Sequence, residues 1–352
     1  MKPLVFAVLA SALSIAGCAP QSSSPMLSPT DITLTPDERA AVAAGQAPEP
    51  DFIARLQGPR EIVDGQTLNA KVQFLLEQSR PNNTPENFAQ EQAAFATPEG
   101  RAEARAETDR RWRIHTLITQ DMARTEDLRI PSRDGGEIPA RLYVPQTTSN
   151  TPLPVLVYYH GGGFIFASVD AVDRLVRLIA NEAQVIVVSV DYRLAPEHPY
   201  PAAHNDAEDA FLWVRANASQ LGGDSARVGA GGDSAGGHLA SVTALRQVAA
   251  SRPTPTQLLL YYPAVTMARD DRSYELFGNG YGLDLPFIET VTNMTFPDVA
   301  MRATAEVSPL NAPSVAGMPP AIVVTAGFDP LRNQGRRFAE RLQTEGGGAV
   351  YH

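Results

Sequence analysis

The chain has 352 residues, of which 43% are hydrophobic and 19% charged, so it can bury a large core and is not disordered overall. The net charge is −10 and no run of five or more Lys or Arg occurs, which argues against a nucleic-acid partner and against electrostatic docking on anionic lipid. The single cysteine, Cys18, excludes an intrachain disulfide, and no Cys/His grouping has the spacing of a zinc site.

The N-terminus has the pattern of a secretory leader, MKPLVFAVLASALSIAGCAP. The apolar stretch over residues 4–16 is too short for a permanent membrane span but suits a cleaved signal. Ala16 and Gly17 then precede Cys18, which resembles the lipobox of bacterial lipoproteins. We predict a signal peptide over residues 1–17 and lipidation of Cys18, the alternative being an ordinary signal peptide with a chance cysteine.

The residues after Cys18 indicate where such a lipoprotein is located. Ala19, rather than Asp, follows the cysteine, which in the lipobox pattern favours the periplasmic face of the outer membrane in the cell envelope. Residues 18–50 are rich in Ser, Pro, Ala and Thr and contain little to bury. We predict that they form a tether between the membrane and a folded domain over residues 51–352.

The first part of that domain, residues 51–116, has helical patterning. Leu68, Val72, Leu75 and Leu76 are spaced i, i+4, i+7 and i+8, which places their side chains on one helix face. We therefore predict a helical region that precedes the rest of the domain.

From about residue 126 onward, short β-rich runs alternate with helical stretches. Several runs are continuously apolar, as expected for strands that are buried on both faces. The alternation predicts a mostly parallel central sheet with helices on both faces, and residues 267–301 interrupt it as an insertion. The predicted strands are 128–131, 138–144, 155–159, 185–190, 228–230, 258–262 and 321–325, and the predicted helices are 172–183, 202–220, 236–250 and 331–345.

Gly232-Asp233-Ser234-Ala235-Gly236 stands between a predicted strand and a predicted helix and matches the G-x-S-x-G nucleophile elbow. Small residues are needed there because a tight strand-to-helix turn strains the serine backbone. The turn would place the Ser234 hydroxyl and the Ala235 N–H at a helix N-terminus, where a developing oxyanion is stabilised. A dinucleotide-binding fingerprint is excluded, because serine occupies the position of its third glycine.

A second glycine motif, His160 to Phe164 (HGGGF), follows the predicted strand 155–159. Consecutive glycines after a buried strand expose backbone N–H groups, which would supply the other half of an oxyanion hole. Taken alone, the motif also fits a plain flexible turn.

These motifs together resemble those of a known family, the bacterial hormone-sensitive-lipase-like carboxylesterases of the α/β-hydrolase fold. The resemblance depends on HGGGF at 160–164, YRLAPEHPYPAA at 192–203, GDSAGG at 232–237 and DPLR at 329–332. It implies hydrolysis of small or medium acyl esters, with no metal and no organic cofactor, and with the small-molecule ester as the partner. It also implies a helical cap over the acyl pocket, formed by residues 51–116 together with 267–301.

The resemblance assigns roles to five residues. Ser234 is the nucleophile and Asp329 orients the triad histidine, while the N–H groups of Gly162, Gly163 and Ala235 bind the oxyanion.

Three further expectations concern neighbouring residues. Ala167 stands where the family has glycine, which is expected to reshape the pocket wall slightly and leave the chemistry unchanged. Arg193 and Glu197 are expected to pair and to support the oxyanion loop. Asp233 is expected to face away from the serine hydroxyl.

The histidine of the triad raises a difficulty. In this fold the triad runs Ser, Asp, His along the chain, yet His352 is the only histidine after Asp329. The family's histidine lies beyond the last strand, and that strand begins here near Ala349. We expect a truncated reading frame; the alternative is a non-catalytic relative that binds a small ligand and lacks the triad histidine.

Overall fold

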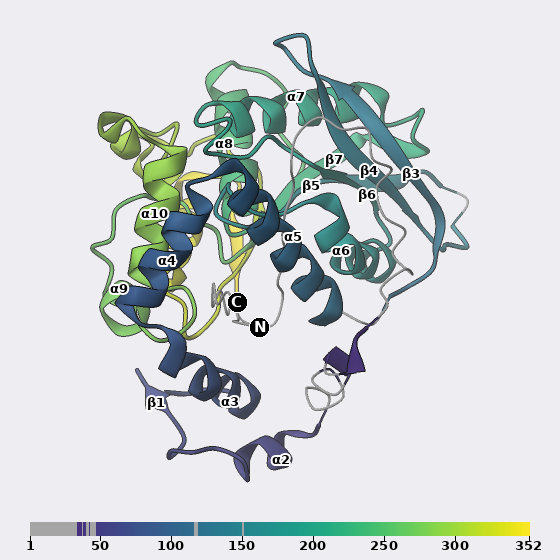
Figure 1. The fold of residues 1–352 in the computed structure, drawn as a ribbon. Coiled ribbons are helices and arrows are strands. Elements are labelled where there is room, and N and C mark those ends of the chain that lie inside the picture. Colours follow the sequence, from purple (N-terminus) through teal and green to yellow (C-terminus); the bar gives the residue numbers. More distant parts are fainter. Residues whose placement is uncertain (1–33, 37, 40–41, 43–46, 116–118, 150) are drawn as a thin grey trace.

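The computed structural model describes residues 34–36, 38–39, 42, 47–115, 119–149 and 151–352 (Figure 1). The predicted signal peptide, residues 1–17, and the predicted lipidation site, Cys18, lie outside the described residues. In the predicted tether, Glu38 forms an ion pair with Arg110, 2.6 Å apart. None of the helices in the described part of the chain is long and apolar enough to cross a membrane.

The core of the fold is an eight-stranded sheet with the order β10-β9-β8-β7-β5-β6-β4-β3. The β3–β4 hairpin pairs antiparallel with the rest of the sheet, and all the other pairings are parallel, as the sequence predicted. A separate small hairpin, β1–β2, precedes it. The strands are β1 (Ile62–Val63), β2 (Gln66–Thr67), β3 (Met122–Pro131), β4 (Glu137–Pro145), β5 (Leu153–Tyr159), β6 (Ile186–Val190), β7 (Gly223–Asp233), β8 (Leu258–Tyr261), β9 (Ala321–Val324) and β10 (Ala349–Tyr351).

Helices pack around the sheet, and a second group of helices lies to the left of the sheet in Figure 1. In that second group α4 runs beside α10, and the two are joined by a hydrogen bond of 2.6 Å from Gln92 to Thr290. The helices are α2 (Glu49–Ile53), α3 (Ala70–Ser79), α4 (Pro85–Phe95), α5 (Pro98–His115), α6 (Val169–Ala183), α7 (Ala202–Asn217), α8 (Ala235–Ala249), α9 (Arg272–Phe277), α10 (Leu285–Thr295) and α11 (Arg332–Glu345).

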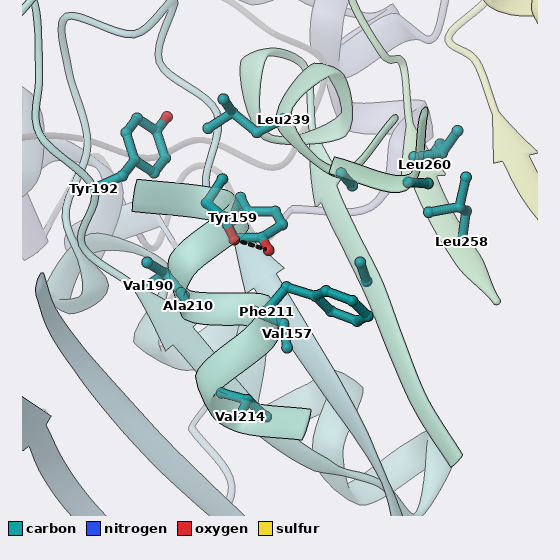
Figure 2. Close-up of a cluster of buried hydrophobic side chains, with 14 of the residues drawn as sticks. Val157, Tyr159, Val190, Tyr192, Ala210, Phe211, Val214, Leu239, Leu258 and Leu260 are labelled. Atoms are coloured by element: carbon teal, nitrogen blue, oxygen red, sulfur yellow. Dashed lines mark hydrogen bonds between the residues drawn. The ribbon is translucent and has the colours of Figure 1, made fainter. Parts of the chain in front are cut away.

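Strand β5 shows why its sequence is apolar without alternation. Val157 and Tyr159 point to one face, where α7 contributes Phe211, and the Tyr159 hydroxyl donates to the Ala207 carbonyl at 2.7 Å (Figure 2). Residues 156 and 158 point to the opposite face and pack against α6. Because side chains alternate across a strand, burial on both faces requires every position to be apolar or hydrogen-bonded.

The register of the parallel strands brings their carboxyl ends together. Tyr159, the last residue of β5, lies opposite Gly232 of β7. Tyr261, the last residue of β8, lies between Asp233 of β7 and Val324 of β9. The loops that follow these four strands therefore leave the sheet at one edge, which is where ligands bind in open α/β sheets.

Strand β10 begins at Ala349, as predicted, and pairs parallel with β9. The ladder continues for one residue past the strand: the His352 N–H donates to the Val323 carbonyl at 2.9 Å, and the His352 carbonyl accepts from the Thr325 N–H at 2.9 Å.

Candidate active site

Ser234 lies at the turn between β7 and α8 in a strained backbone conformation. Its φ is +53° and its ψ is −115°, which few residues other than glycine adopt. The turn is fixed from two sides, because the Ser234 N–H donates to the Tyr261 carbonyl at 2.9 Å and the Ser234 carbonyl accepts from the His238 N–H at 3.0 Å. This is the geometry of the predicted nucleophile elbow.

The glycines of the elbow are required by close backbone contacts. A Cβ on Gly232 would overlap the Tyr159 carbonyl oxygen, and a Cβ on Gly236 would overlap the same oxygen. The elbow can therefore sit this close to the end of β5 only with glycine at both positions.

The HGGGF motif forms a loop beside the elbow, and its backbone is left-handed at Gly162 (φ +99°) and Gly163 (φ +61°). The N–H groups of these two glycines donate to no acceptor among the described residues, and both glycines line a cavity. Ala235 is the first residue of α8, so its N–H has no carbonyl of its own helix to bind. Unpaired N–H groups at a helix N-terminus favour an anionic oxygen.

Asp329 follows β9 in a turn over the start of α11. Its Oδ1 accepts the Leu331 N–H at 2.7 Å. Burial raises the pKa of Asp329 to about 7, and the Leu331 hydrogen bond and the nearby Arg332 oppose that rise. Arg332 is held in turn by Asp64 of the β1–β2 hairpin, 2.6 Å away, a contact that the sequence did not signal because 268 positions separate the two residues.

One cavity of about 280 Å³ connects all of these groups. It is lined by Ser234, Asp329, Gly162, Gly163 and Ala235, so the structure brings together every residue predicted for the site.

The remaining wall of the cavity is mainly apolar. Much of it is supplied by the N-terminal helical region and by the insertion at 267–301, the two segments predicted to form the cap. Their lining side chains include Leu68, Val72, Leu76, Trp112, Leu283, Phe287, Ile288, Val291 and Phe296.

No histidine of the described residues lines this cavity. His204 and His238 are buried and hydrogen-bonded to each other, with their Nε2 atoms 2.8 Å apart. His160 is buried and stacks on Tyr192, with ring centroids 4.2 Å apart. His352 pairs through its backbone with β9 and is exposed.

The predicted pair Arg193–Glu197 is wrong. Arg193 instead binds Asp206 of α7 at 2.7 Å and Asp134 of the β3–β4 turn at 2.6 Å. Glu197 binds two arginines of α5 (see below). Residues 193–197 are not helical, so a spacing of four does not bring the two side chains to one face.

The expectation for Ala167 is also corrected. Ala167 is fully buried and is not among the residues that line the cavity. Its φ of +99° explains why the family has glycine there, because a Cβ disfavours that backbone conformation. Asp233 behaves as expected: its Oδ1 accepts from the Tyr158 hydroxyl at 2.7 Å and from the Gly161 N–H at 3.0 Å.

Comparison with known proteins places the chain in a family. The model of the family described as alpha/beta hydrolase fold matches residues 156–352, more than half of the chain. The chain belongs to this family. Carboxylic ester hydrolase LipN of Mycobacterium tuberculosis is 40% identical over 299 residues, which cover 82% of this chain and 75% of the relative. An arylesterase of Saccharolobus solfataricus is 36% identical over 226 residues, covering 63% of this chain and 72% of the relative.

Solved structures agree with the fold. EstE1, a thermostable carboxylesterase cloned from a metagenomic library, is 36% identical with a TM-score of 0.68, covering 72% of this chain and 86% of that one. A hyperthermophilic esterase from Pyrobaculum calidifontis is 36% identical with a TM-score of 0.68, covering 75% and 87%. The predicted α/β-hydrolase fold is thereby confirmed.

Proposed function

We propose that the protein is a serine hydrolase that cleaves carboxylic esters with small to medium acyl groups. The observation that carries the proposal is the convergence on one cavity of a strained serine, a half-buried aspartate and the N–H groups of three small residues. The esterase names of the relatives support the same reaction and disfavour the alternative of a non-catalytic binding protein.

In the proposed reaction the Ser234 Oγ attacks the acyl carbon, and a histidine base takes the hydroxyl proton. The N–H groups of Gly162, Gly163 and Ala235 stabilise the oxyanion of the tetrahedral intermediate. The histidine returns the proton to the leaving alcohol, and water then cleaves the acyl-enzyme. Asp329 holds the histidine in the required tautomer. By the family's chain order, this base would be a histidine that follows Asp329 in the sequence.

The substrate class follows from the cavity. Its apolar walls favour the burial of an uncharged acyl chain, and a volume of about 280 Å³ suits a short or medium acyl chain.

Ser234→Ala tests the proposal in the full natural protein. We expect nearly all hydrolysis of p-nitrophenyl butyrate to be lost, because loss of a triad nucleophile leaves only the weak contribution of the oxyanion hole. Ser241→Ala is the matched control: Ser241 lies on the same helix, α8, and its hydroxyl donates to the Gly237 carbonyl away from the cavity. Full turnover by Ser234→Ala with native circular dichroism, or a parent protein with no esterase activity, would contradict the proposal.

We further propose that Cys18 carries a lipid that attaches the protein to the membrane, on the periplasmic face of the outer membrane. The support is the sequence pattern around Cys18. Acyl chains contribute about 0.8 kcal/mol for each buried methylene, so a multiply acylated terminus stays bound. Cys18→Ser should move the protein from the membrane pellet to the soluble or unprocessed fraction, and unchanged palmitate labelling of that variant would refute the lipid anchor.

A further inference from the structure

One guanidinium from the N-terminal helical region contacts the loop that carries Gly162 and Gly163. Arg105, on α5, is only 3% exposed. Its Nε donates to the Ile165 carbonyl at 2.9 Å, and its Nη2 donates to the Ala195 carbonyl at 2.8 Å. Arg105 therefore links two loops, the HGGGF loop and the loop that follows β6, and it does so from a separate element, helix α5.

The position of this guanidinium is itself fixed by a carboxylate. Arg105 binds Glu197 with both of its terminal nitrogens, Nη1 to Oε1 at 3.1 Å and Nη2 to Oε2 at 2.8 Å. The two-pronged geometry fixes the plane of the guanidinium and neutralises its buried charge. Partial burial acts to raise the pKa of Glu197, but the hydrogen bonds from Arg105 and Arg101 outweigh it and hold that pKa at about 2.

The loop that Arg105 contacts is strained. Gly162, Gly163, Phe164 and Ala167 all have positive φ, at +99°, +61°, +63° and +99°. Phe164 and Ala167 are not glycines, so the loop persists in this form only if surrounding contacts hold it there.

The contact with Arg105 falls on the turn that presents the free N–H groups. The N–H groups of Ile165 and Phe166 both donate to the Gly162 carbonyl, at 3.1 and 3.0 Å, which closes the turn. The Ile165 carbonyl that Arg105 binds belongs to this turn, one residue beyond Phe164. Together with the Ala195 N–H, which donates to the Phe164 carbonyl at 2.9 Å, this contact holds the orientation of the turn and with it the directions of the Gly162 and Gly163 N–H groups.

We propose that Arg105 is a positioning residue for the oxyanion hole, acting through the Ile165 carbonyl. It is fixed by Glu197 and keeps the turn from Gly162 to Phe166 oriented so that the glycine N–H groups face the cavity. This role rests on the proposed esterase function and extends it to the N-terminal helical region, which would then help to form the active site as well as cover it.

The same helix offers a matched control. Arg101 lies one turn before Arg105 and binds the same Glu197, at 2.6 Å. Its other hydrogen bonds go to the carbonyls of Phe95 and Ala96, in and just after α4. Arg101→Ala thus removes an ion pair between α5 and Glu197 without removing any described contact to the HGGGF loop.

The test compares Arg105→Ala, Arg105→Lys and Arg101→Ala with the parent in the full natural protein. Two readouts are used: kcat and KM for p-nitrophenyl butyrate, and amide hydrogen exchange of a peptide spanning residues 160–167. For Arg105→Ala we expect kcat to fall about 10- to 100-fold with KM within about threefold, because displaced oxyanion donors weaken transition-state binding more than substrate binding. Exchange in the loop should be about tenfold faster.

The two control variants sharpen the result. Arg101→Ala should keep kcat and loop exchange within about twofold of the parent. Arg105→Lys retains the charge but not the planar fork, so it should recover only part of kcat, and it provides the same readouts if the alanine variant does not fold.

The inference fails if Arg105→Ala has the parent's kcat and loop exchange, or if Arg101→Ala shows the same losses. If the parent itself hydrolyses no ester, the proposed function fails instead. In that case loop exchange alone decides whether Arg105 holds the loop.

Discussion

Asp233, the residue before Ser234, offers a direct test of how burial acts on this site. The residue is 3% exposed, and its Oδ1 accepts from the Tyr158 hydroxyl at 2.7 Å and from the Gly161 N–H at 3.0 Å. Asp233→Asn keeps an oxygen at that position, so it can retain both hydrogen bonds while it removes the charge.

The size of the effect follows from the pKa of the carboxyl. Burial raises the pKa of Asp233 from 3.8 to about 6, against the opposing hydrogen bonds from Tyr158 and Gly161. At 1.36 kcal/mol per pKa unit, this corresponds to about 3 kcal/mol of unfolding free energy. Because the pKa of Asp233 is higher in the folded state than in the unfolded state, the folded protein is most stable with respect to this group below about pH 4. That stability is lost as the pH rises through about 6 and the buried carboxyl becomes charged. The asparagine variant does not undergo this loss.

Urea denaturation of the parent and of Asp233→Asn, measured from about pH 4 to about pH 8, tests this reasoning. We expect the stability of the variant relative to the parent to increase by about 3 kcal/mol across that range. Asp134→Asn is the flat control: hydrogen bonds from Ser132 and Arg193 lower the pKa of Asp134 to about 2, so its linkage to stability lies below about pH 4 and its difference from the parent should stay nearly constant over this range. A difference between Asp233→Asn and the parent that stays constant with pH would refute the assignment of a buried, destabilising charge.

Three further predictions concern the backbone and the N-terminal hairpin. Ala167→Gly should raise the unfolding free energy by about 1–3 kcal/mol in urea, because it relieves a φ of +99°; an unchanged midpoint would contradict this. Gly236→Ala should yield no native, active protein, as judged by circular dichroism and ester hydrolysis, because its Cβ would overlap the Tyr159 carbonyl oxygen. Asp64→Asn should speed amide exchange in residues 62–67 at low salt, because Asp64 pairs with Arg332 at 2.6 Å and with Arg272 at 3.3 Å. The difference should be much smaller at high salt, where these ion pairs are screened in the parent as well. Equal exchange in parent and variant at low salt would show that the ion pairs do not hold the β1–β2 hairpin in place.

The parts of the fold that the sequence predicted are those fixed by short-range constraints. Strands buried on both faces appear as apolar runs, so β5 to β9 could be located without knowledge of their neighbours. The elbow could be located because Gly232 and Gly236 each lie against the Tyr159 carbonyl, where no side chain fits. In both cases the residue types that meet the requirement lie within one short segment of the sequence, even where the contact itself is with a distant strand.

The parts that could not be predicted depend on polar partners that are distant in the sequence. Glu197 lies four positions from Arg193, but the loop after β6 is not helical, so this spacing does not bring the two side chains together. Arg193 binds Asp206 instead, a fully buried carboxylate on α7. Arg105 is separated from Ile165 by 60 positions, and nothing in its local sequence distinguishes it from Arg101. Ala167 carries no sign of its backbone conformation, since only comparison with the family's glycine indicates the left-handed φ.

The buried histidine pair shows which base Ser234 cannot use. His238 lies one turn along α8 from Ser234, but its Nδ1 contacts the Ala264 carbonyl at 2.8 Å and must therefore carry the proton. Its Nε2 then accepts from the Nε2–H of His204, so both nitrogens of His238 are engaged and the two rings stay neutral. Burial lowers the pKa of His238 to about 4, and the ring of Phe164 packs on both imidazoles. A ring with no free lone pair cannot accept the proton of the serine hydroxyl. In the proposed reaction, therefore, His238 cannot be the general base, although it lies close to Ser234 in the sequence.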